Sequence, residues 1–106
     1  MPATRRRRAP SRPDPGREVR RTLQSIPNIG PAMAEDLVRL GVRRVADLRT
    51  RDPLEMYERL ARLDGARHDP CVLDTFMSAV DYARTGRARP WWRYTPARKR
   101  LLARGT

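Results

Sequence analysis

His68 and Cys71 stand three residues apart, with Asp69 between them and Asp74 shortly after. Imidazole, thiol and carboxylate groups at that spacing suggest either a metal site or a cysteine–histidine nucleophile. A zinc site needs about four protein ligands, or three and a water molecule. The chain contains one His and one Cys, which is too few to complete a ligand set or to orient a base. We therefore expect no catalytic residue, no metal site and no enzyme activity. Cys71 is interpreted as a small core residue whose thiol pKa is lowered by a helix N-terminus.

Two carboxylates, Asp74 and Asp81, lie seven residues apart and hence on one face of a helix. A shared site would suit acid–base catalysis. Arg67 and Arg84 are near them in the sequence, so we interpret the carboxylates as members of solvated surface ion pairs.

Aromatic and cationic side chains alternate near the end of the chain, where Trp91, Trp92 and Tyr94 stand among Arg87, Arg89 and Arg93. Aromatic rings stack on unpaired bases and Arg side chains neutralise phosphates, so this pattern is typical of a platform for single strands. The alternative is that at least one Trp folds back and covers the helical core, because large aromatic side chains are usually mostly buried.

A tight turn is predicted at Pro27–Pro31 between two helical segments. Asn28 and Gly30 tolerate left-handed backbone conformations, and we expect one of them to have a positive φ. Ile29 is placed to fill the gap between the helices, and Ala34 allows them to approach closely. Gly30 is expected to need a conformation or a clearance that a Cβ would violate.

Residues 23–37 resemble the helix-hairpin-helix motif, with Asn28, Ile29, Gly30 and Ala34 in its characteristic places. The resemblance implies that amides at the start of the second helix, here those of Gly30, Ala32 and Met33, face a DNA phosphate. It also implies that the hairpin carbonyls can hold a monovalent cation; no other cofactor is expected. The sequence departs from the motif in two ways. Asn28 replaces a Gly, with a side chain that either crowds a phosphate or donates to it, and two acids follow the turn, Glu35 and Asp36.

Capping signals define the elements that position these residues. Asp-Pro pairs at 52–53 and 69–70 begin helices, and Gly65 and Gly86 follow their ends. Together with helices at 17–26 and 31–41 and a short helix through 42–48, this predicts five helices in residues 17–85 and no strand. The residues expected to be largely buried are Leu23, Ile29, Ala34, Leu37, Val45, Leu60, Leu73, Phe76 and Val80.

The fold class that follows is all-α: a compact five-helix domain at 17–86 containing one helix-hairpin-helix motif. A flexible arm rich in Arg and Pro precedes it at 1–16, and a basic aromatic extension follows at 87–106. Charge is divided unevenly along the 106 residues, because residues 1–20 carry +5, residues 21–83 carry −1 and residues 84–106 carry +8. Basic ends around a nearly neutral body are typical of proteins that bind polyanions.

Read whole, the chain resembles a family of small bacterial proteins, the pathogenicity-locus family. The likeness rests on IPNIGPAMAEDL, DPLEMYERL, DPCVLDTFMSAVDYA and PWWRYT, and covers about residues 20–95. It implies a helix-hairpin-helix domain and names no substrate.

We therefore expect a nucleic-acid-binding module that does not read sequence, with DNA favoured over RNA. The alternative is an adaptor that docks on a protein and uses the hairpin only structurally. A single Cys and the lack of a long apolar run favour a soluble, cytoplasmic protein with no membrane partner. The predicted contact residues are Asn28, Gly30, Ala32, Met33, Arg5, Arg6, Arg7, Arg8, Arg87, Arg89, Trp91, Trp92, Arg93, Arg98, Lys99 and Arg100.

Overall fold

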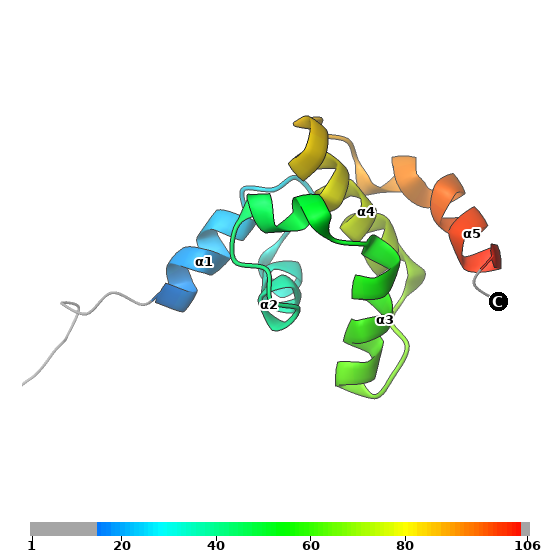
Figure 1. The fold of residues 1–106 in the computed structure, drawn as a ribbon, viewed down its shortest axis with the longest axis horizontal. Helices are drawn as coiled ribbons and strands as arrows, with labels where there is room; N and C mark the ends of the chain where they lie inside the picture. The colour runs from blue at the N-terminus through cyan, green and yellow to red at the C-terminus, as the bar shows by residue number, and fades with distance from the viewer. Residues whose placement is uncertain (1–14, 105–106) are drawn as a thin grey trace, which may run out of the picture.

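In the computed structural model, which describes residues 15–104, the protein is all-α (Figure 1). No strand occurs in that range, and none of its helices is long and apolar enough to cross a bilayer. Residues 1–14, which include Arg5, Arg6, Arg7 and Arg8 of the predicted arm at 1–16, and residues 105–106 lie outside the described part. The prediction of a flexible arm was wrong at Pro15 and Gly16, which form the start of α1. The elements are α1 (Pro15–Leu23), α2 (Pro31–Arg39), the 3₁₀ helix η1 (Val45–Thr50), α3 (Pro53–Asp64), α4 (Pro70–Thr85), the 3₁₀ helix η2 (Trp91–Tyr94) and α5 (Thr95–Arg104).

The helix ends follow the capping signals in the sequence. The side chains of Asp52 and Asp69 each accept a hydrogen bond from the backbone N–H two residues further on, at 3.0 and 2.9 Å. Gly65 and Gly86 end α3 and α4 in the left-handed conformation, with φ of 66° and 78°. Five helical segments therefore occupy the region where five were predicted, the short one being η1. The first helix begins and ends earlier than the predicted 17–26, the second ends before the predicted 41, and η1 lies later than the predicted 42–48.

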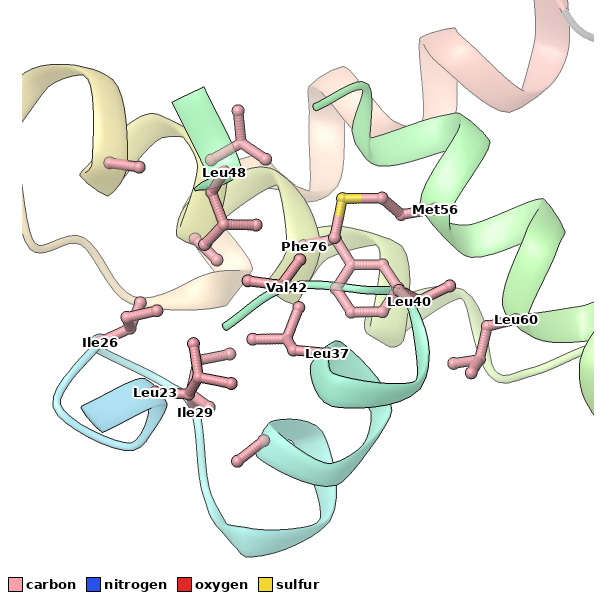
Figure 2. Packing of buried hydrophobic residues seen from close by; sticks show 14 of the residues in the cluster. Leu23, Ile26, Ile29, Leu37, Leu40, Val42, Leu48, Met56, Leu60 and Phe76 are labelled. Carbon is pink, nitrogen blue, oxygen red and sulfur yellow. The ribbon is translucent and has the colours of Figure 1, made fainter. Parts of the chain in front are cut away.

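The core is organised around α4, which packs against η1, α3, η2 and α5, whereas α1 packs chiefly on α2. Phe76 on α4 is fully buried, and side chains from α2, η1 and α3 gather close to it (Figure 2). The core prediction is confirmed except at Val45, which is only partly buried. The cluster comprises Leu23, Ile26, Ile29, Ala34, Leu37, Leu40, Val42, Leu48, Met56, Tyr57, Leu60, Leu73, Phe76, Ala79, Val80 and Ala83.

Polar contacts help to attach α5 to the body, because α5 has no fully buried residue and only Leu101 and Leu102 pack, partly buried, against the core. Asp74 is completely buried on α4, and its carboxylate accepts from Arg98 Nε at 2.8 Å and from Thr95 Oγ1 at 2.6 Å. This ion pair raises the pKa of the Arg98 guanidinium. The prediction that Asp74 belongs to a solvated surface ion pair was wrong, because Asp74 is buried and its carboxylate faces α5.

Asp81 has a different partner as well. Its carboxylate accepts a hydrogen bond from the Tyr94 hydroxyl at 2.5 Å. Burial, together with this bond, raises the pKa of Tyr94 to about 12. Arg84, the expected ion-pair partner, instead donates to the carbonyls of Arg49 and Arg51. Asp74 and Asp81 thus fix η2 and the start of α5 on the surface of α4.

Candidate nucleic-acid interface

The turn between α1 and α2 has the backbone that the sequence predicted. Asn28 has a φ of 72° and is the one non-glycine residue in the described chain with a positive φ. Ile29 is 5% exposed and Ala34 is fully buried. The Ala34 N–H donates to the Gly30 carbonyl at 2.9 Å, which closes the first turn of α2.

Gly30 does not have the role that we expected. Its φ of −92° and ψ of −172° are open to any residue, and a Cβ built there has no neighbour within 4 Å. The prediction was wrong because Asn28 makes the left-handed step, which leaves Gly30 extended and exposed. The N–H groups of Ala32 and Met33 lie in the first turn, where a helix offers them no partner, and no side chain caps α2. Gly30, Pro31 and Ala32 are exposed and Met33 is partly buried, so the start of α2 lies at the protein surface.

The Asn28 side chain turns into the protein. Its Nδ2 donates to Ser78 Oγ on α4 at 3.0 Å and to the Arg89 carbonyl at 2.7 Å. Both amide protons are thus engaged, so this side chain neither crowds a phosphate nor donates to one. It instead joins the turn to the segment that precedes η2. Sequence reasoning missed this contact because 61 residues separate Asn28 from Arg89.

The two acids after the turn are paired with arginines. The Glu35 carboxylate accepts hydrogen bonds from Arg20 Nε at 2.5 Å and from Arg20 Nη2 at 3.1 Å. This pair joins α1 to α2. These contacts lower the pKa of the Glu35 carboxyl. Asp36 lies 3.5 Å from Arg39 Nη1, while burial raises the pKa of its carboxyl. The repulsion that these acids would exert on a phosphate is therefore partly neutralised within the fold.

His68 and Cys71 do not form a common site. The prediction that Cys71 is a core residue was wrong, because Cys71 is only partly buried and lies outside the core cluster. His68 Nε2 lies 2.6 Å from Asp64 Oδ2, one turn back along the chain. The pKa of the Cys71 thiol is raised by burial and by the adjacent Asp69, so the predicted lowering was wrong. Within residues 15–104 no three His, Cys, Asp or Glu side chains gather as a metal site would require.

The aromatic pair lies at the surface on η2. Trp91 is 37% exposed and Trp92 is 59% exposed, and neither belongs to the core cluster. Nearby cationic side chains at Arg87, Arg89 and Arg93 are exposed, as are Lys99 and Arg100 on α5. Arg98 differs from them, because its guanidinium is held by Asp74 and its side chain is only 16% exposed. The structure thus gives Arg98 a place inside the fold and leaves the other predicted cations at the surface.

Comparison with known proteins identifies a family and a relative, and neither is described by a ligand. A family model described as "Pathogenicity locus" (Cdd1) matches residues 17–100. A protein of Streptomyces lavendulae named "Mitomycin resistance protein McrB" is 54% identical over 81 residues, which make up 76% of this chain and 77% of that protein. No solved structure matches the chain.

Proposed function

The chain belongs to the pathogenicity-locus family, and we propose that this member binds nucleic acid through its phosphates, without reading base sequence. The α1–α2 turn supplies backbone amides, and the basic segment from Arg87 to Arg100 supplies most of the electrostatic affinity in the described part. DNA is the favoured ligand, because the turn resembles a motif that contacts DNA phosphates.

One observation carries the proposal: the hydrogen bond at 2.7 Å from Asn28 to the Arg89 carbonyl. It places the α1–α2 turn next to the backbone of the basic segment, although the two are far apart in the sequence. In this proposal, a phosphate backbone that passes the amides of Ala32 and Met33 continues along Arg87 and Arg89. Amide dipoles and guanidinium groups would then act on the same strand.

The charges near this junction favour a polyanion. Residues 82–104 contain eight cationic side chains and no Asp or Glu. Asp81, just before them, accepts a hydrogen bond from Tyr94, and Glu35 is paired with Arg20. Such a surface attracts phosphates at low salt and loses affinity as salt rises, because binding releases counterions from the nucleic acid. Phosphate contacts position a protein without reading bases.

Two matched charge-removal variants test the proposal. Arg87→Gln with Arg93→Gln removes two exposed cations of the basic segment. Arg43→Gln with Arg59→Gln removes two exposed cations from the loop after α2 and from α3. The first variant should flatten the salt dependence of duplex binding by about 1.8 log units per log unit of salt, whereas the second should leave it nearly unchanged.

Equal effects of the two variants would mean diffuse attraction without an interface and would contradict the proposed surface. A lack of effect from either variant would contradict it as well. If the intact chain binds no nucleic acid at low salt, a protein-docking adaptor replaces the proposal.

A further inference from the structure

Two tryptophans form an exposed corner on η2. The ring centroids of Trp91 and Trp92 are 5.8 Å apart and the ring planes meet at 85°. Trp92 is 59% exposed. Such exposure is unusual for Trp, whose large aromatic side chain is mostly buried in folded proteins. Exposed aromatic surface beside cationic groups is typical of sites that bind planar, negatively charged ligands.

The corner is held rigidly from both sides. Before it, the Arg89 carbonyl accepts from Asn28. After it, Tyr94 donates to Asp81 at 2.5 Å and Thr95 donates to the buried Asp74 at 2.6 Å. These contacts fix the backbone of η2 on α4, so the exposure of the rings belongs to the ordered fold. A preformed aromatic surface binds without a large ordering cost.

The perpendicular arrangement limits what the corner can accept. Two parallel rings separated by a gap would sandwich a base, and two coplanar rings would carry consecutive stacked bases. Rings at 85° do neither. One base can lie flat on the Trp92 face while its edge or its sugar rests against Trp91. Inside a duplex both faces of a base are already stacked, so only an unpaired or terminal base has a free face.

The surrounding charge selects the same class of ligand. Arg93 lies between the rings and Tyr94 in the chain, and Arg89 precedes them by two residues. Two residues of extended chain span at most about 7 Å, so the corner lies close to the carbonyl that Asn28 holds. No acid occurs in residues 82–104 that would oppose a phosphate.

We infer that the Trp91–Trp92 corner binds one unpaired base, so that the preferred ligand is single-stranded nucleic acid or the single-stranded side of a duplex junction. This inference rests on the proposed function and names its ligand class. Stacking carries the preference for single strands, whereas the cationic segment and the α2 amides hold the neighbouring phosphates. The preference is tolerant of sequence, because every base has a π face.

Intrinsic fluorescence tests the inference directly, because the chain contains only these two tryptophans. The full chain is titrated with a 12-nucleotide single strand, with a blunt duplex of equal length, and with that duplex bearing a single-stranded overhang. The single strand and the overhang should quench the emission strongly, and the blunt duplex should quench it weakly. Trp92→Ala should weaken single-strand binding about tenfold, equivalent to about 1.4 kcal/mol, and Trp92→Phe should weaken it less.

Leu63→Ala is the matched control, because Leu63 is also a large exposed apolar residue, at 51%, but lies on α3. It should leave affinity for the single strand unchanged. Thermal melting is measured for Trp92→Ala and Leu63→Ala, and a melting temperature equal to that of the wild type would show that the variant is folded. If Trp92→Ala instead melts early, the affinity of Trp92→Phe decides, and a tenfold or greater loss for that variant would contradict stacking.

Failure of this inference is distinguishable from failure of the proposed function. The binding of a base by the Trp91–Trp92 corner would be contradicted, and the proposed function left standing, by one combination of results. That combination is salt-dependent binding without quenching, equal affinity for single strand and duplex, and no loss of affinity in Trp92→Ala. An absence of binding to all three ligands at low salt would overturn both.

Discussion

Replacement of Arg98 by Met should strongly destabilise the protein, because it leaves the Asp74 carboxylate buried without a counter-charge. Asp74 is fully buried, and Arg98 Nε donates to it at 2.8 Å from a side chain that is only 16% exposed. Met keeps most of the apolar stem and removes the guanidinium, so packing changes little. Loss of one partner of a buried ion pair costs about 3–5 kcal/mol. A domain of this size has about 5–15 kcal/mol of total stability, so a large fraction would be lost.

Urea unfolding followed by circular dichroism measures this change. Lys99→Met is the matched control, because Lys99 is the next residue and is exposed; it should alter the free energy of unfolding by less than about 0.5 kcal/mol. The double variant Asp74→Leu with Arg98→Met removes both charges and should recover much of the loss. A loss below about 1 kcal/mol in Arg98→Met would refute the reasoning and return Arg98 to the set of cations available to a ligand.

Three other substitutions probe the fold. Phe76→Ala should cost about 3–5 kcal/mol in urea unfolding because it empties a fully buried site; a cost under 1 kcal/mol would contradict the core. Gly30→Ala should change stability by less than about 0.5 kcal/mol, given its ordinary backbone and open surroundings, and a large loss in thermal melting would restore the steric argument. Tyr94 has a pKa raised to about 12 in the folded protein, so folding favours the neutral phenol and stability should fall as pH rises from about 10 to 12. Tyr94→Phe should flatten that fall in alkaline melts, and an unchanged profile would show that another group causes it.

The elements of the fold were predictable because their signals are local. Asp52 and Asp69 stand one residue before a Pro, and the glycines at 65 and 86 stand where the helices end, so the boundaries of α3 and α4 were set by neighbouring residues. In the turn, residue type limited the positive φ to Asn28 or Gly30, and the structure assigns it to Asn28. The buried face of α4 followed from the spacing of its apolar residues.

The contacts that assemble the candidate site were not predictable, because their partners are distant in the sequence. Asp74 has the pattern of an exposed carboxylate, and only the packing of α5 brings Arg98 to it from 24 residues away. The sequence left two roles open for the Asn28 amide, to crowd a phosphate or to donate to it. In the fold the amide instead donates to Ser78 and to the Arg89 carbonyl. Gly30 was assigned a steric role that Asn28 already fills. Local patterns determine where helices begin and end, whereas the direction of a polar side chain depends on elements that pack later in the chain.

The salt dependence of binding by the intact chain tests the central claim most directly. A fluorescently labelled single strand is titrated with protein at salt concentrations from 50 to 300 mM. The exposed cations Arg87, Arg89, Arg93, Lys99 and Arg100 predict a slope of about −3.5 or steeper in a plot of log affinity against log salt, at about −0.7 for each phosphate neutralised on a single strand. A slope near zero, or no binding at 50 mM salt, would contradict the claim that this protein binds nucleic acid through phosphates.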